Sequence, residues 1–574
     1  MNDSHTWMER LADQVAERAS GAATSGTVAS GTAVVCASGI SPSGPIHLGN
    51  LREVVTTHLV VEALRRRGVD AVHLHSWDDY DRLRKVPAGV DEQFQRYVGA
   101  PLSAVPDPWG RTDSYASHFI DEFTGALDVL GIRMREVRQS TQYPSGTYNA
   151  AIRTALEHRG LIFDTLAAQQ TPGRLERPAA ERRREYYPFR PYCEACGKDE
   201  TQIEEYAGET VGYRCRCSHQ GTMSLADGAK ISGKLVWKVD WPMRWAHEGV
   251  AFEPAGEDHH APTGSFTVGR HLVESLYGGR APHSAVYSFV SLAGANGKMS
   301  GSAGGAAIPS TALDVLEPAL VRWLYTRRLP EQSFAIDLTP VSVQRLYDEW
   351  DRMAARVQDG AEPGEARVRS YCVRTSAGPV DHTPRAVPFR LLGATADITA
   401  ANREQMVRIV RQHLPADERP AADDELLRTL EPRLSCAINW ATRLVPPQHR
   451  TTIAGAFDTA EWDRLDERTR RALRLLVDRL GDAWDLDSLT TLVYSVPKLM
   501  LGLPAEAGPT PEIKQAQREF FKTMYRLLCA GETGPRLPTL LLSIGLDRSR
   551  SLLAPPSAPP STGDRRDETT ATPG

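Results

Sequence analysis

Two short stretches, far apart in the sequence, carry residues suited to binding a triphosphate. The first, PSGPIHLGN (42–50), places His47 and Asn50 after a Pro-Ser-Gly turn. An imidazole there can donate hydrogen bonds to phosphate oxygens, and the glycines allow the backbone to approach a ligand closely. The second, GANGKMSGS (294–302), sets Lys298 among glycines and small hydroxyl residues, which is typical of a mobile loop over a triphosphate. Taken singly, each stretch has a plainer interpretation: a turn histidine that caps a helix, or a solvated loop with an exposed lysine.

Acidic and aromatic residues that could bind an ammonium group follow in WDDYD (77–81). A buried ammonium needs a carboxylate, an aromatic face or both. Asp78 and Asp79 are therefore candidates for binding a cationic substrate, and a solvated acidic turn is the alternative. Trp241, Asp258 and His259 form a second such group later in the chain.

Four of the eight cysteines form a cluster with metal-ligand spacing, in Cys-x2-Cys and Cys-x-Cys pairs. The residues are Cys193, Cys196, Cys215 and Cys217. Two close pairs separated by a short connection suit tetrahedral zinc, and a closed four-ligand site is structural rather than catalytic. Because the second pair is unusually tight, His219 is an alternative to Cys217. We favour the four cysteines.

The residues around the first stretch predict a strand–helix–strand unit. AVVCAS (33–38) is typical of a buried strand, and DAVHLHS (70–76) predicts the next one. Between them, apolar residues recur every four positions, which indicates a helix: Leu51, Val55, Leu59 and Ala63. A right-handed crossover of this kind opens a doubly wound parallel sheet, whose ligands bind at the carboxyl ends of the strands.

The composition is that of a globular protein: 574 residues, 41% hydrophobic and 24% charged, with a net charge of −5. This slight net charge does not indicate a non-specific nucleic-acid binder, although local basic patches are compatible with it. No apolar run approaches the roughly 20 residues that cross a bilayer, and the N-terminus lacks the apolar core of a secretory signal. We therefore expect a cytoplasmic protein that binds neither membrane nor DNA.

We expect the chain to be organised in four parts. In order, these are an N-terminal amphipathic helix and loop (1–32), an α/β domain (33–310) with an insertion (about 79–165) and the cysteine segment (about 188–223), a helical part (311–553), and a tail (554–574). The tail is rich in Pro, Ser, Thr and charge, so we expect it to be disordered. LVWKVDW (235–241) looks like a further strand.

Together, HLGN (47–50) and KMSGS (298–302) resemble the two signature motifs of class I aminoacyl-tRNA synthetases. ASGISPSGPIHLGNLREV (37–54), HSWDDYDRLRKVP (75–87) and residues 234–261 are similar to the class I lysyl-tRNA synthetases in particular. The resemblance is specific from about residue 33 to 330 and continues more loosely to 553. AKISGK (229–234) is similar to the second signature, but it runs directly into LVWKVDW, so we rank it below residues 298–302.

The resemblance implies a Rossmann-type catalytic domain with an inserted zinc ribbon, followed by an all-α anticodon-binding domain. It implies activation of lysine with ATP to lysyl-adenylate and pyrophosphate, and then transfer of lysine to tRNA(Lys). The expected catalytic residues are His47, Asn50, Lys298 and Ser300. The expected ATP contacts are Pro42, Ser43, Gly44, His47, Gly49, Asn50, Lys298, Met299, Ser300, Gly301 and Ser302. The expected lysine contacts are Gly39, Ser41, Asp78, Asp79, Trp241, Asp258 and His259.

We expect Mg²⁺ to accompany the triphosphate, one structural Zn²⁺, and a monomer. Archaeal members of the family carry a second zinc near the segment that matches PDPWGRTDSYASH (106–118), where this chain has Arg111 and Thr112 in place of ligands. We therefore expect that metal to be absent and the loop to be held by packing, through Trp109 and Tyr115.

Two other functions are compatible with such a fold. One is a paralogue that activates lysine without charging tRNA, which the long helical part argues against. The other is a non-catalytic RNA-binding protein, which the intact signature residues argue against.

Overall fold

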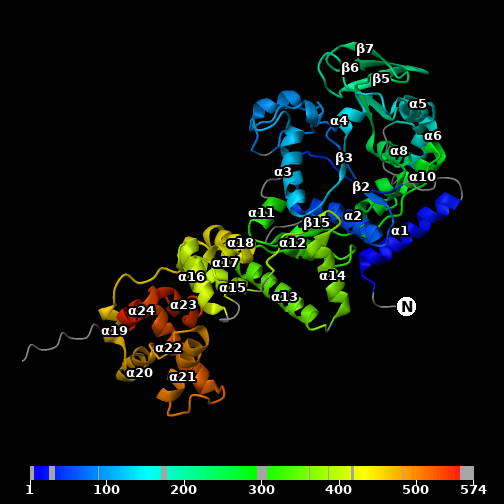
Figure 1. Ribbon diagram of the computed structural model, residues 1–574. Coiled ribbons are helices and arrows are strands. Elements are labelled where there is room, and N and C mark those ends of the chain that lie inside the picture. The colour runs from blue at the N-terminus through cyan, green and yellow to red at the C-terminus, as the bar shows by residue number, and fades with distance from the viewer. Residues whose placement is uncertain are drawn as a thin grey trace, which may run out of the picture. The chain divides into compact units, whose positions relative to one another are not determined.

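The computed structural model describes residues 5–24, 33–87, 89–169, 177–293, 307–360, 362–384, 387–414, 419–482 and 484–555. The chain divides into two compact units, Met1–Thr383 and Pro384–Gly574 (Figure 1). Among the described residues, no helix has both the length and the apolar character needed to cross a membrane. Nearly all of the predicted disordered tail lies outside the described residues.

The first unit is built on a four-stranded parallel sheet of order β3-β2-β1-β9. Its strands are β1 (Val34–Ile40), β2 (Ala71–Trp77), β3 (Arg135–Arg138) and β9 (Val250–Phe252). β1 and β2 pair in register from Val34 with Ala71 to Ile40 with Trp77. The strand–helix–strand prediction is therefore confirmed, with α2 (Leu48–Arg66) as the crossover.

Helices cover both faces of this sheet. The apolar face of α2 is buried on one side, and α8 (Trp237–Glu248) with α10 (Ser265–Tyr277) packs on the other. The prediction of a strand over LVWKVDW is wrong beyond its first residue, because β8 (Gly233–Leu235) ends there and α8 begins at Trp237. The tryptophans of this segment recur every four residues, which is the helical period.

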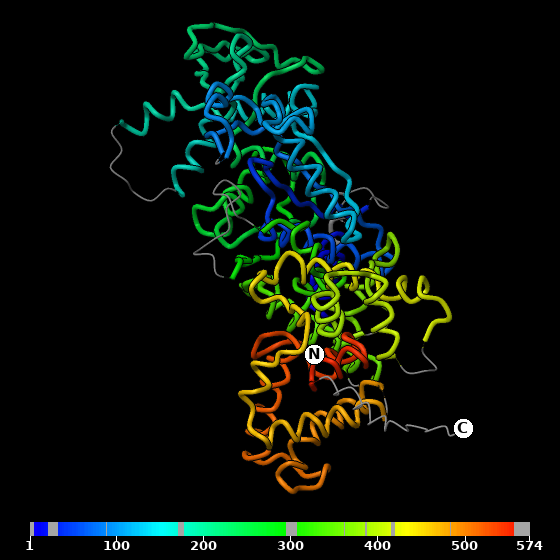
Figure 2. Tube along the Cα trace, turned by 90° about the vertical axis from the view of Figure 1, so that its left-hand side faces the viewer, coloured from blue at the N-terminus to red at the C-terminus, as the bar shows by residue number. Residues whose placement is uncertain are grey.

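The other elements of the first unit surround this core. They are α1 (Trp7–Thr24), η1 (Glu92–Tyr97), η2 (Leu102–Ala104), α3 (Tyr115–Val129), α4 (Gln139–Gln142), α5 (Asn149–Glu157), α6 (Arg159–Ala168), α7 (Ala179–Glu185), β4 (Phe189–Pro191), β5 (Thr201–Ala207), β6 (Thr210–Cys215), β7 (Gln220–Ser224), β10 (Ala255–Gly256), α9 (Glu257–His260), β11 (Val286–Tyr287), β12 (Val290–Leu292), α11 (Pro309–Leu313), α12 (Pro318–Thr326), β13 (Phe334–Ile336), α13 (Pro340–Gln358), α14 (Pro363–Val373), β14 (Arg374–Thr375) and β15 (Gly378–Pro379). The antiparallel sheet β5-β6-β7 lies at the periphery of this unit in both views (Figures 1 and 2).

Two features of the first unit differ from the organisation expected from the sequence. β3 pairs with β2 in the central sheet, although it falls inside the expected insertion. Its sequence, REVR, is short and mostly charged, so it gives no strand signal. The unit also extends to Thr383, well beyond residue 310, because α12 and α14 pack within it.

The described part of the second unit is helical. Its elements are α15 (Phe389–Ile398), α16 (Arg403–His413), α17 (Asp423–Leu430), α18 (Arg433–Asn439), η5 (Trp440–Leu444), η6 (Pro447–His449), α19 (Thr459–Arg464), α20 (Glu467–Arg479), α21 (Leu486–Met500), α22 (Pro511–Cys529), α23 (Leu537–Ile544) and α24 (Leu546–Leu553). Leucines make up most of the buried cluster formed by α20 to α24. The Pro- and Gly-containing segment 501–510 separates α21 from α22.

Candidate active site

The histidine of the first signature caps the helix that follows it. His47 is the N-cap of α2: its Nδ1 accepts a hydrogen bond from the Gly49 N–H at 3.0 Å, and the Asn50 Oδ1 accepts from the His47 N–H at 3.2 Å. A Cβ atom at Gly49 would lie 2.8 Å from the His47 ring, so the ring can fold back only over glycine. The imidazole and the carboxamide are thus held at the positive end of α2, where anions bind.

Described residues on either side of the second signature lie beside this helix end. Lys298, Met299, Ser300, Gly301 and Ser302 lie outside the described residues. The residues on either side are placed, since Ala307 accepts a hydrogen bond from the Leu48 N–H at 2.9 Å, and a Cβ at Gly49 would lie 3.4 Å from the Val290 carbonyl. Val290 and Ala307, which precede and follow segment 294–306, therefore both lie close to the N-terminus of α2.

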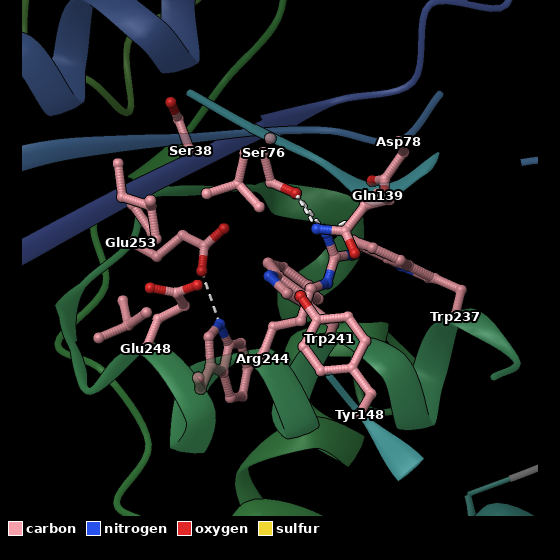
Figure 3. Close-up of a pocket in the computed structure, with 16 residues that line it drawn as sticks. Ser38, Ser76, Asp78, Gln139, Tyr148, Trp237, Trp241, Arg244, Glu248 and Glu253 are labelled. Atoms are coloured by element: carbon pink, nitrogen blue, oxygen red, sulfur yellow. Dashed lines mark hydrogen bonds and ion pairs between the residues drawn. The ribbon is translucent and has the colours of Figure 1, made fainter. Parts of the chain in front are cut away.

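A pocket opens between the carboxyl ends of the central strands and α8 (Figure 3). Gly39 of β1, Ser76 of β2 and Glu253, just after β9, line it from the sheet, and Trp241 and Arg244 line it from the helix. The free space is about 30 Å³, room for one or two water molecules. An amino-acid side chain can enter only if lining side chains move.

Asp78 already has cationic partners inside the protein. Its carboxylate lies 3.2 Å from Lys234 Nζ and 3.1 Å from an Arg244 nitrogen, and Asp240 and Asp81 complete the network. Burial alone would raise the pKa of Asp78, but the two cations hold it below its ordinary value. Lys234 is the second lysine of AKISGK, and its burial excludes the role of a mobile loop lysine for this residue.

Two other carboxylates at the same edge differ from Asp78. Glu53 accepts from the Gly39 N–H at 2.8 Å and from the Tyr287 hydroxyl at 2.7 Å, and Glu253 accepts from Trp245 Nε1 at 2.6 Å. Among the described residues, no lysine or arginine nitrogen lies within 4.0 Å of either carboxylate. Burial raises the pKa of Glu53 to about 8 and that of Glu253 to about 7, despite these hydrogen bonds.

The remaining predicted substrate residues are distributed around this edge. Trp241 stacks on Trp237 at 5.0 Å and meets His259 edge-on at 5.4 Å. Asp258 lies with His259 on α9, and Ser41 directly follows β1. Asp79 is turned elsewhere, because both of its oxygens accept hydrogen bonds from Ser140, at 2.9 and 2.6 Å.

The four cysteine sulfur atoms of the predicted metal site lie within 4.8 Å of one another. The Cys193–Cys217 and Cys196–Cys215 sulfur pairs are each separated by 3.7 Å. Zinc–sulfur bonds of about 2.3 Å in a tetrahedron place sulfur atoms about 3.8 Å apart. The geometry thus fits zinc, with Cys217 rather than His219 in the cluster.

The loop 106–118 is organised around one carboxylate. Asp107 accepts backbone hydrogen bonds from Trp109, Arg111 and Thr112 at 2.8 to 3.0 Å, and its Oδ2 lies 3.2 Å from His118 Nδ1. The Trp109 ring stacks on Tyr115 at 6.4 Å. Hydrogen bonds to Asp107 therefore hold the loop in addition to the expected aromatic packing.

This geometry agrees with the comparison of the sequence with known families. The family described as tRNA synthetases class I (K) matches residues 5–376. The chain belongs to this family of class I lysyl-tRNA synthetases. The lysine–tRNA ligase of Streptomyces coelicolor is 44% identical over 95% of this chain and 98% of its own. That of Pyrococcus horikoshii is 35% identical over 90% and 94%, and that of Borreliella burgdorferi 32% over 89% and 93%.

Sequence reasoning missed Glu53, Glu253 and the cations Lys234 and Arg244 at this synthetase site. Glu53 was missed because, in the sequence, it is one of several polar residues of an amphipathic helix. A signal was present all the same, since Glu53 follows the HLGN motif by less than one helical turn. The pairing of Lys234 with Asp78 gives no such signal, because it joins residues far apart in the sequence.

Proposed function

We propose that this chain is a lysine–tRNA ligase that forms lysyl-adenylate from lysine and ATP and then esterifies tRNA(Lys). The observation that carries the proposal is a family match over residues 5–376 together with a sheet edge where Glu253 lines the pocket and Glu53 accepts a hydrogen bond from the Gly39 N–H. Among the described residues, neither carboxylate has a lysine or arginine nitrogen within 4.0 Å. The test is the charging of total tRNA with lysine, with arginine and ornithine as controls. Charging with lysine alone is expected, and charging with arginine or ornithine instead would contradict the proposal.

Lysine brings two ammonium groups and one carboxylate to the pocket. Asp78 is already neutralised by Lys234 and Arg244, so Glu53 and Glu253 are the better partners for the ammonium groups. Trp241 supplies an aromatic wall for the aliphatic chain and a cation–π contact. Among the residues predicted from the sequence, this proposal keeps Gly39, Ser41, Trp241, Asp258 and His259 at the lysine site and gives Asp78 and Asp79 supporting roles.

The proposed ATP site lies at the N-terminus of α2. Attack of the lysine carboxylate on the α-phosphate releases pyrophosphate, so catalysis consists of positioning and electrostatic stabilisation. His47 and Asn50 would contact phosphates or ribose, and Lys298 and Ser300 would act from segment 294–306, whose described neighbour Ala307 accepts a hydrogen bond from the Leu48 N–H. Pro42, Ser43 and Gly44 precede α2 in the sequence, and Gly49 lies in its first turn. Mg²⁺ bound to the triphosphate would neutralise charge there.

The proposed zinc would be held by Cys193, Cys196, Cys215 and Cys217. Cys193 and Cys196 precede β5, Cys215 ends β6 and Cys217 lies before β7, so the cluster belongs to the antiparallel β5-β6-β7 segment and not to the central sheet. This position fits a structural role. A four-thiolate set leaves no open position for a substrate.

The tRNA contact is proposed on the second unit, where the helical part would read the anticodon. On α21 the Tyr494 side chain is 44% exposed, and its ring meets Phe521 of α22 edge-on at 5.0 Å. Lys514 and Arg518 are exposed on α22 near Gln517, which donates to the Tyr494 carbonyl. An exposed aromatic ring beside basic side chains suits the stacking of an unpaired RNA base.

A further inference from the structure

The guanidinium of Arg52 is buried beside the proposed lysine site, and none of the steps proposed above uses it. Arg52 lies on α2 directly before Glu53, and its side chain is 1% exposed. Its Nη2 donates to the carbonyls of Leu329 and Pro330 at 2.6 and 2.7 Å and lies 3.3 Å from that of Gln332. The charge is therefore bound by the backbone of one turn, between α12 and β13.

A cation held in this way is costly to bury. Burial lowers the pKa of Arg52 to about 10, and its Nε and Nη1 have no hydrogen-bond partner among the described residues. A methionine or leucine would fill the same volume without this cost. What only the guanidinium supplies is a fixed attachment of α2 to the 329–332 turn.

The 329–332 turn is also connected to the lysine pocket. The Pro330 carbonyl that accepts from Arg52 also accepts from the Ser288 N–H at 3.0 Å. Ser288 directly follows Tyr287, whose hydroxyl donates to Glu53 at 2.7 Å. Consecutive residues of α2 thus hold the 286–289 segment twice, Glu53 directly and Arg52 through the turn.

We propose that Arg52 is a positioning residue for the amino-acid pocket. By holding the 329–332 turn against α2 it fixes Ser288, and so places the Tyr287 hydroxyl that orients the Glu53 carboxylate. The inference rests on the proposed lysine site and adds to it a residue that touches no substrate.

The test compares two buried arginines in steady-state ATP–pyrophosphate exchange. Arg52→Lys keeps the charge and loses the planar fork of donors. Because Glu53 would bind lysine equally in the ground and transition states, the KM for lysine should rise about 10-fold while kcat stays within about 3-fold. The KM for ATP should not change, and Arg52→Met, which also removes the charge, should raise the KM for lysine further.

Arg322→Lys is the matched control. Arg322 is 0% exposed, donates to the carbonyls of Tyr371 and Leu130 at 2.7 and 2.9 Å, and has a pKa lowered by burial to about 10. Its variant should lose stability as Arg52→Lys does and keep the wild-type KM for lysine. An unchanged KM in Arg52→Lys, or an equal rise in Arg322→Lys, would overturn the inference.

A second variant tests the same inference if Arg52→Lys does not fold. Phe334→Leu keeps the guanidinium and removes the ring over which it lies, at 5.2 Å. It should raise the KM for lysine by a smaller factor, on the order of 3-fold, and no rise would count against the inference. A wild-type protein without any lysine-dependent exchange would instead overturn the proposed function, and this inference with it.

Discussion

At the residue scale, Asp78 and Glu53 lie at the same sheet edge but differ in their partners. Asp78 is bound by Lys234 and Arg244, so it belongs to the wall of the pocket. Glu53 and Glu253 are bound by hydrogen-bond donors without charge, and burial raises the pKa of each. A ligand with two ammonium groups would supply the missing positive charge.

This difference predicts how lysine affinity depends on pH. Ammonium groups favour the ionised carboxylates, so binding must displace protons from Glu53 and Glu253, whose pKa values without ligand are about 8 and about 7. Affinity should be lost as pH falls through these values, and the KM for lysine should decrease about 10-fold between roughly pH 7 and pH 8. Exchange kinetics at saturating ATP measure this. The KM for lysine should change less with pH in Glu53→Gln. A KM for lysine that does not change with pH in the unmodified protein would contradict the assignment of Glu53 and Glu253 to the ammonium groups.

At the scale of elements, the strand–helix–strand unit could be predicted from the sequence because its apolar residues follow the periods of strand and helix. The position of His47 at the start of α2 could be predicted for the same reason, while its chemical role stays a prediction. β3 and α8 could not be predicted from the sequence. REVR is polar, and the apolar residues of LVWKVDW fit the strand period as well as the helical period. The partners of Asp78 depend on how β8 and α8 pack against β2, which no local pattern reports.

The buried network predicts a large effect for Lys234→Ala. Removing this cation leaves Asp78 and Asp240 buried with one fewer positive partner, which should lower the free energy of unfolding by about 3–5 kcal/mol. Urea denaturation measures it. Lys238→Ala is the control on α8, because that lysine donates to the exposed Thr263 carbonyl and, within the part of the chain that the structure describes, forms no ion pair; it should cost less than about 1 kcal/mol. Equal stability losses would contradict the role assigned to the network.

The cysteine cluster predicts one zinc per chain. Metal analysis should find about one equivalent, lost in the double variant Cys193→Ser with Cys196→Ser and kept in Cys372→Ser, whose thiol is buried in α14. A structural zinc contributes roughly 10–16 kcal/mol of apparent binding free energy in small domains, so its loss should unfold β5-β6-β7. Two zincs per chain would contradict the expectation that Asp107 organises loop 106–118 without a metal.

At the scale of the whole molecule, the two compact units are proposed to divide the two half-reactions. The first unit contains the pocket and the HLGN helix, and the second presents Tyr494 with the exposed Lys514 and Arg518 of α22. On this proposal, activation of lysine would use only the first unit, whereas charging would use both. Defects in the second unit should therefore appear in tRNA kinetics alone.

Tyr494→Ala tests this division. Loss of one stacked base costs about 1–3 kcal/mol, so the KM for tRNA in charging should rise about 10- to 100-fold. Lysine-dependent ATP–pyrophosphate exchange should be unchanged. Tyr494→Phe, which keeps the ring, should retain most of the activity. A variant that charges tRNA normally would show that Tyr494 is not the contact.

The most direct test of the central claim is lysine-dependent ATP–pyrophosphate exchange by the unmodified protein, Glu53→Gln and Glu253→Gln. The unmodified protein should exchange with lysine and not with arginine or ornithine. Each glutamine keeps a hydrogen-bond acceptor and loses the charge, so the KM for lysine should rise on the order of 100-fold, with the KM for ATP unchanged. Exchange that requires another amino acid, or a KM for lysine unaffected in both variants, would contradict a lysine-activating site built on these two carboxylates.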